Sequence, residues 1–180
     1  MIHTKSFLTK GVGIHRDKLA SFELALRDAK IEKYNLVSVS SILPPNCKVV
    51  PREEGLESLR SGEIVHCVLA KNQTNEPYRL LAAAVGTAVP VNEENYGYIS
   101  EHQSFGEDEV KAGEYAEDLA ATMLATTLGI EFDANSAWVE REHLYKASGH
   151  LIDTTHICQI ANGDVNRRWT TVVAALVFVE

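Results

Sequence analysis

The sequence has few of the residues that mark a secreted or a metal-binding protein. Its 180 residues include only three cysteines, two methionines and two tryptophans. Cys47, Cys67 and Cys158 are odd in number and widely spaced, which fits neither a disulfide framework nor a zinc pattern. We therefore expect reduced, buried thiols in a cytoplasmic protein.

Long apolar runs and basic clusters are also absent. The longest apolar stretches, residues 80–90 and 170–179, are too short to cross a bilayer, and the first residues lack the apolar segment of a secretory signal. Acidic residues outnumber basic ones by 25 to 17, which gives a net charge of -8. This charge argues against a nucleic-acid partner and favours a cationic ligand. We expect neither a nucleic-acid nor a membrane partner.

What is present has the composition of an ordinary globular protein. Apolar residues make up 45% of the chain and charged residues 23%. A chain of 180 residues fits one domain with a single sizeable core. Strand-like and helix-like segments are mixed along it, with a strand-rich C-terminal part. The predicted fold class is α+β, a multi-layer sandwich of mixed or antiparallel β-sheets flanked by α-helices.

Strands are predicted where β-branched residues or alternating patterns dominate. The predicted strands cover residues 35–42, 47–51, 63–72, 78–91, 96–103, 156–161 and 169–179, with a short first strand within 6–15 and a further one over 138–146. We expect the first strand to end at its glycines and Gly86 to allow close packing.

Two helices are predicted from apolar residues at helical spacing. The first covers residues 17–35 with Asp17 as N-cap, and the second covers 106–128, with Ser104 and Glu107 as a capping box and Gly129 just beyond its end. Residues 52–62 indicate a charged surface turn or helical turn.

Ser40 and Ser41 stand side by side where a strand must stop, just before Pro44 and Pro45. Small hydroxyl residues suit a strand end because they hydrogen-bond to nearby backbone. Alternatively, the Ser41 hydroxyl attacks the Ser40 carbonyl and converts the amide to an ester, helped by prolines that restrict the backbone. These residues alone leave both interpretations open.

The surroundings of the two serines resemble the pyruvoyl-dependent arginine decarboxylases. The resemblance is carried by "NLVSVSSILPP" (35–45), "YGYISE" (96–101) and "SFE" (21–23), and it extends over nearly the whole chain. It implies a decarboxylase-like sandwich fold and self-cleavage between Ser40 and Ser41, into a β chain (1–40) and an α chain (41–180).

The resemblance also implies a cofactor made from the chain itself. After the ester forms, β-elimination leaves Ser40 as a carboxylate and Ser41 as a dehydroalanine. Hydrolysis of the latter gives a covalently bound pyruvoyl group and ammonia. That group forms a Schiff base with arginine and accepts the electrons left by departing carbon dioxide, so that the product is agmatine.

Four further site residues follow from the same resemblance. Glu101 is the implied acid that returns a proton after decarboxylation, and Asn35 polarises the Ser40 carbonyl during cleavage. Glu23 meets the substrate guanidinium where the family has the shorter aspartate, and Leu19 is a pocket residue. Without the resemblance, the alternatives are that Glu101 is a solvated carboxylate at a strand exit, Asn35 a turn residue and Glu23 a surface carboxylate.

The family assembles as trimers of αβ protomers, sometimes doubled to hexamers, so a homo-oligomer with sites between neighbours is implied. Two other functions stay open. One is an N-terminal nucleophile hydrolase that uses Ser41, and the other is an unprocessed binding protein for a cationic amino acid. His143, His150 and His156 have no zinc-binding spacing, and no metal site is expected. The arginines of "NRRW" (166–169) are expected to be solvated in a turn.

Overall fold

The computed structural model describes residues 2–91, 94–129 and 152–180. Its strands are β1 (Lys5–His15), β2 (Asn35–Ser38), β3 (Ile42–Leu43), β4 (Lys48–Val49), β5 (Ile64–Thr74), β6 (Leu80–Pro90), β7 (Gly97–Phe105), β8 (Ile152–Asn162) and β9 (Trp169–Val179). Its helices are α1 (Lys18–Asp28), α2 (Arg52–Glu57) and α3 (Glu109–Thr127). The strand predicted over 138–146 lies outside the described residues.

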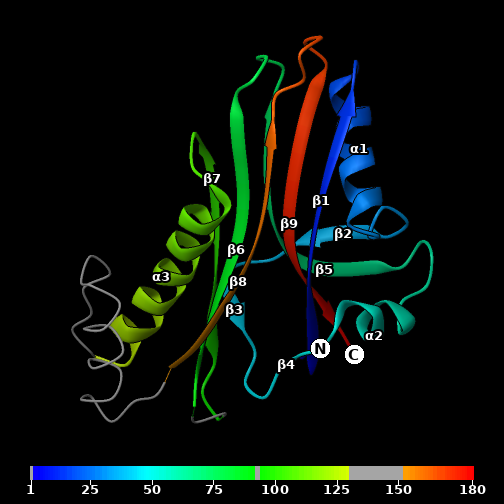
Figure 1. Cartoon of the computed structure of the whole chain (residues 1–180). Helices are drawn as coiled ribbons and strands as arrows, with labels where there is room; N and C mark the ends of the chain where they lie inside the picture. The colour runs from blue at the N-terminus through cyan, green and yellow to red at the C-terminus, as the bar shows by residue number, and fades with distance from the viewer. Residues whose placement is uncertain (1, 92–93, 130–151) are drawn as a thin grey trace.

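The strands form two sheets that pack face to face (Figure 1). The first has the order β2-β5-β9-β1-β4 and the second β3-β7-β6-β8. Most neighbours are antiparallel, whereas the β2–β5 and β1–β4 pairs are parallel. Helix α1 packs on the outer face of the first sheet and α3 on the outer face of the second. The predicted α+β sandwich is therefore confirmed, with four layers in the order α/β/β/α.

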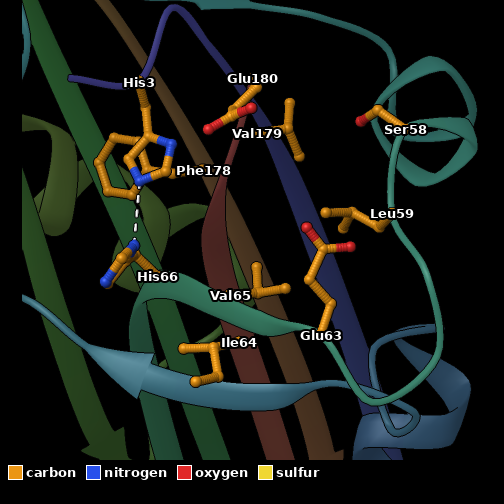
Figure 2. Close-up of a pocket in the computed structure, with 10 residues that line it drawn as sticks. All are labelled: His3, Ser58, Leu59, Glu63, Ile64, Val65, His66, Phe178, Val179 and Glu180. Carbon is orange, nitrogen blue, oxygen red and sulfur yellow. Dashed lines mark hydrogen bonds between the residues drawn. The ribbon is translucent and has the colours of Figure 1, made fainter. Parts of the chain in front are cut away.

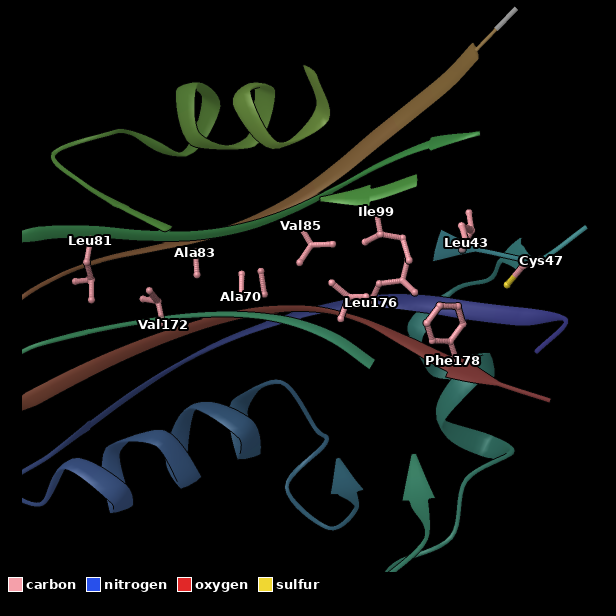
Figure 3. Packing of buried hydrophobic residues seen from close by; sticks show 12 residues of the cluster. Leu43, Cys47, Ala70, Leu81, Ala83, Val85, Ile99, Val172, Leu176 and Phe178 are labelled. Carbon is pink, nitrogen blue, oxygen red and sulfur yellow. The ribbon is translucent and has the colours of Figure 1, made fainter. Parts of the chain in front are cut away.

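Strand β9 explains why its sequence reads as one apolar run. Alternate side chains, from Val172 to Phe178, enter the core between the sheets, and the others, from Val173 to Val179, face α1 and α2. Both faces are covered, so a simple polar and apolar alternation is lost. Figure 3 shows the core between the two sheets, with helices on the outer side of each sheet.

Two glycines set how closely the helices approach the sheets. A Cβ on Gly86 of β6 would lie 2.3 Å from the Ala116 carbonyl carbon of α3, so the predicted close packing is confirmed. A Cβ on Gly11 would lie 2.2 Å from the Ala25 oxygen of α1. The prediction that the first strand ends at its glycines is wrong, because β1 continues to His15 beneath the helix.

Three local predictions need correction. Helix α1 begins at its predicted cap Asp17 but ends near Ala29, because Lys30 takes a left-handed backbone with φ of 62°. Helix α3 is capped by the Asp108 side chain, which accepts the Lys111 N–H at 2.8 Å, and not by Ser104. Strand β7 continues to Phe105, beyond its predicted end, so Ser104 belongs to the strand.

The predicted turn before β9 is present, and both of its arginines are exposed. One of them also organises the turn, because the Arg168 guanidinium donates to both carboxylate oxygens of the buried Asp164, at 3.0 and 2.8 Å. Its charge and hydrogen bonds lower the pKa of Asp164 to about 2. Such paired bonds between guanidinium and carboxylate are among the stronger polar contacts in proteins.

The three cysteines are buried free thiols, as predicted. Burial raises the pKa of Cys67 and of Cys158 to about 11. None of the helices in the described ranges is long and apolar enough to cross a membrane.

Candidate functional site

The Ser40–Ser41 bond lies where the chain passes from one sheet to the other. The predicted strand over 35–42 is two strands, because β2 pairs with β5 in the first sheet and β3 pairs with β7 in the second. Hydrogen bonds fix the chain on both sides of the bond. The Val39 N–H donates to the Cys67 carbonyl at 3.0 Å, and the Ile99 N–H donates to the Ser41 carbonyl at 2.8 Å. A short backbone segment is thus held between two rigid sheets.

The Ser40 carbonyl, which self-cleavage would attack, already accepts a hydrogen bond. The Ile42 N–H donates to its oxygen at 3.0 Å, which closes a three-residue turn around Ser41. A donor at this oxygen is suited to stabilise the negative charge that develops there during attack. Ser41 is half-buried and Ser40 exposed, so the bond lies at the molecular surface.

Glu101 lies two residues along β7 from Ile99, the residue that binds the Ser41 carbonyl. Two residues of a strand span about 7 Å and place both side chains on one face. Ile99 is fully buried in the core between the sheets, so the Glu101 carboxyl faces that side too. Glu101 is exposed as a whole residue, but its carboxyl group is partly surrounded by protein. The resulting desolvation raises the pKa of Glu101. A raised pKa suits a group that must be protonated to act as an acid.

Asn35 is not brought to the Ser40 carbonyl of the same chain. It begins β2, and its amide donates to the Gly62 carbonyl at 2.8 Å. Ser40 lies five residues beyond Asn35, a distance of about 16 Å in extended chain. In one chain, the donor at the Ser40 carbonyl is therefore the Ile42 N–H and not the Asn35 amide.

Leu19 and Glu23 lie on α1, which packs against the outer face of the first sheet. The Ser40–Ser41 bond leads instead to β3 in the second sheet, so one chain does not join these residues to the bond (Figure 1). The Leu19 side chain is 75% exposed and contributes to no apolar cluster of the described chain. The Glu23 carboxylate accepts a short hydrogen bond from the Arg27 guanidinium one turn along the helix.

A pocket of about 230 Å³ adjoins the Ser40–Ser41 bond. Residues from both sides of the bond and from three other segments form its walls: His3, Val39, Ser40, Ile42, Pro44, His66 and Phe178. The walls are mainly apolar, with two imidazoles among them.

Comparison with known proteins identifies the family. A family model described as pyruvoyl-dependent arginine decarboxylase matches residues 5–180. The chain belongs to the pyruvoyl-dependent arginine decarboxylase family. The match includes the Ser40–Ser41 bond, both of its backbone donors and Glu101.

Close relatives carry the same family name. Pyruvoyl-dependent arginine decarboxylase 2 of Methanosarcina mazei is 78% identical over 99% of this chain and 98% of its own length. Pyruvoyl-dependent arginine decarboxylase of Methanococcoides burtonii is 71% identical over 99% of each chain. A probable pyruvoyl-dependent arginine decarboxylase of Chloroherpeton thalassium is 58% identical over 99% of this chain and 98% of its own length. Members of the family are decarboxylases that depend on a covalent pyruvoyl group.

Some features of the site could not be found from sequence motifs. The donors at Ser40 and Ser41 are backbone N–H groups of Ile42 and Ile99, so no side-chain pattern marks them. The histidines of the pocket, His3 and His66, are far apart in sequence and belong to no motif. Only the register of the strands brings these groups together. Of the three histidines considered for zinc, His156 bonds to Glu117, and the other two lie outside the described residues.

Proposed function

We propose that this protein cleaves its own backbone between Ser40 and Ser41 and then decarboxylates arginine to agmatine. The observation that carries the proposal is the position of this bond in a family of pyruvoyl-dependent enzymes. It links two sheets, and a backbone donor contacts the carbonyl on each side of it. The expected products are a β chain of residues 1–40 and an α chain of residues 41–180.

The cleavage chemistry follows from the turn around Ser41. Its Oγ attacks the Ser40 carbonyl carbon, and the bond to the Ser41 nitrogen breaks as the ester forms. The Ile42 N–H supports the oxygen that carries charge during this step. Elimination then breaks the Cβ–Oγ bond of Ser41 and leaves the electron pair on the Ser40 carboxylate. Water replaces the nitrogen of residue 41, which departs as ammonia.

The residues present fit a pyruvoyl group at position 41. Such a group supplies a ketone that reacts with the substrate amine and, beside it, a carbonyl that withdraws electrons. That second carbonyl is the one Ser41 already has, and the Ile99 N–H donates to it at 2.8 Å. The backbone of β7 thus orients and polarises the carbonyl on which electron withdrawal depends. Glu101, two residues further along β7, is the proposed proton donor to the substrate carbon.

Substrate binding is proposed to use a second copy of the chain. Glu23 and Leu19 lie on the opposite side of the first sheet from β3, so another protomer must bring them to Ser41, in a trimer or hexamer. Any role of Asn35 in cleavage needs a neighbour for the same reason. The assignment is supported by the Glu23 carboxylate accepting a hydrogen bond from the Arg27 guanidinium, which has the same chemistry as the guanidinium of arginine. The free buried thiols support a cytoplasmic location.

The Ser41→Ala variant tests the cleavage step. Alanine has no hydroxyl to attack the Ser40 carbonyl, so the variant should remain a single chain without activity. Intact mass spectrometry of the wild type should give two chains, the longer one lacking the mass of ammonia. Edman degradation should fail on that longer chain, whereas success would indicate a free serine and an N-terminal nucleophile hydrolase. A wild type that stays whole after long incubation, yet binds arginine, would instead be a binding protein.

A further inference from the structure

Two histidines form a contact pair beside the Ser40–Ser41 bond. His3, just before β1, and His66 on β5 share a hydrogen bond of 3.0 Å between Nε2 and Nδ1, with ring centroids 5.1 Å apart. The His3 ring also stacks on Phe178 at 5.4 Å (Figure 2). Both imidazoles are partly buried. The catalytic proposal above uses neither of them.

The two histidines share a pocket with the residues on either side of the proposed cut. His3 and His66 line the 230 Å³ pocket together with Ser40 and Ile42, which lie on the two sides of Ser41. Before cleavage, Ser40 lines this pocket without a charge, as part of an ordinary peptide chain. After cleavage, residue 40 ends in a carboxylate at a largely apolar wall, where an unpaired charge is unfavourable.

The end of the β chain cannot move far once the bond is cut. Val39 donates its N–H to the Cys67 carbonyl at 3.0 Å, and Val37 is the register partner of His66. Only Ser40 lies beyond this last ladder bond. Its new carboxylate is therefore released next to the strand that carries His66.

The pair is suited to take up one proton, not two. Burial lowers the pKa of His3, and a charge on His66 lowers it further, whereas Glu180 raises it. The other charged groups around the pair are Glu63, which lines an adjoining pocket with Glu180, and the amino group that begins the chain. Elimination releases the Cα proton of residue 41 as the carboxylate forms, so one proton on the pair keeps the pocket neutral.

We propose that the His3–His66 pair is a carboxylate-binding site that captures the new Ser40 terminus and anchors the β chain after cleavage. This inference rests on the proposed self-cleavage. The protonated pair can bind the Ser40 carboxylate, which exists only after cleavage. The pair therefore stabilises the cut form relative to the uncut form. His3 and His66 are positioning residues in this scheme, since they contact neither the substrate nor the reacting ketone.

Histidine titration by NMR tests the proposal directly. The histidine ring signals of the mature wild type are compared with those of the uncut Ser41→Ala protein. Both proteins contain Glu180, so its effect on the pKa of His3 is the same in the two samples. The titration midpoint of the pair should be higher in the cut protein by about one pH unit or more. The ring signals of His102, which bonds to Glu107 outside the pocket, are the control and should be the same in both proteins. Equal midpoints for the pair in cut and uncut protein would overturn the inference. A wild type that mass spectrometry finds uncut would instead remove the proposed function.

Carboxypeptidase digestion gives a second measure that does not depend on titration. In the mature protein, removal of Ser40 from the β chain should be about tenfold faster for His66→Gln than for the wild type, because a charge-assisted hydrogen bond is lost. His3→Gln should have the same direction of effect and replaces His66→Gln if that variant fails to fold. His102→Gln is the matched control and should be trimmed at the wild-type rate. Equal trimming of all four proteins contradicts the proposal.

Discussion

Replacing Glu101 with glutamine should separate decarboxylation from the proposed self-cleavage. Self-cleavage is proposed to use the Ser41 hydroxyl and the Ile42 N–H, neither of which the substitution changes. Glutamine has nearly the same size as glutamate, so β7 and its contact with Ser41 should persist. An amide is a very poor proton donor, however, and the later decarboxylation step should slow. Glu101→Gln should therefore be fully cut and weakly active.

The size of the loss follows from the role of the group. A positioned general acid contributes roughly 10²- to 10⁴-fold to a rate, which corresponds to about 2.7–5.5 kcal/mol in the barrier. The pH dependence adds a second signature. Desolvation raises the pKa of Glu101, so its acid form persists to higher pH than that of an ordinary glutamate. Wild-type turnover should fall as the pH rises through this pKa, and that fall should be absent in Glu101→Gln.

The assay measures carbon dioxide released from carboxyl-labelled arginine, normalised to the amount of cut chain found by intact mass spectrometry. Glu114→Gln, which changes an exposed carboxylate on α3, is the matched control and should keep wild-type turnover. Full turnover in Glu101→Gln would show that the proton donor is another group. An uncut Glu101→Gln protein would show that Glu101 acts in maturation, contrary to the division of roles given above.

Three further outcomes are expected. Gly86→Ala would place a methyl group 2.3 Å from the α3 backbone, so urea unfolding should report a loss of about 1–3 kcal/mol. Because Arg168 lowers the pKa of Asp164 from 3.8 to about 2, this carboxylate stabilises the fold above pH 3.8, and the contribution is lost as the pH falls to about 2. The melting temperature of Asp164→Asn should thus depend less on pH across this range. Cys67 and Cys158, with a pKa of about 11, should react slowly with Ellman's reagent at pH 8 until guanidinium unfolds the protein.

Much of the fold could be predicted from local patterns. The predicted strand over 169–179 has the observed bounds, because an apolar run flanked by polar residues can be recognised from neighbouring residues alone. Predictions failed where distant packing decides the outcome. Residues 35–42 have the pattern of one strand, but β5 and β7 each pair with one end of it. In the same way, Gly11 looks like a strand end until α1 is packed against it.

The candidate site was predictable only in part, for a similar reason. The two serines and Glu101 form a recognisable motif with their neighbours in sequence, and the family match includes them. The resemblance implies a role for Asn35 at the Ser40–Ser41 bond, whereas in a single chain the donor at the Ser40 carbonyl is the backbone N–H of Ile42. Backbone donors have no sequence signature. The proposed contact of Leu19 with a second protomer would likewise leave no sign in the fold of one chain, where this side chain is 75% exposed.

The position of the proposed cut has a consequence for how the molecule could be built. β1, from the segment before the cut, pairs with β9 from the segment after it at all eleven positions of each strand. Two separately made pieces, 1–40 and 41–180, would have every contact needed to assemble. Yet on the proposed chemistry the assembled fragments would be inactive. A Ser41 that begins a polypeptide has no upstream carbonyl to attack, so it keeps its amine and no pyruvoyl group forms. On this proposal, the peptide bond between the sheets is needed as a reactant in maturation but not to hold the folded sandwich together.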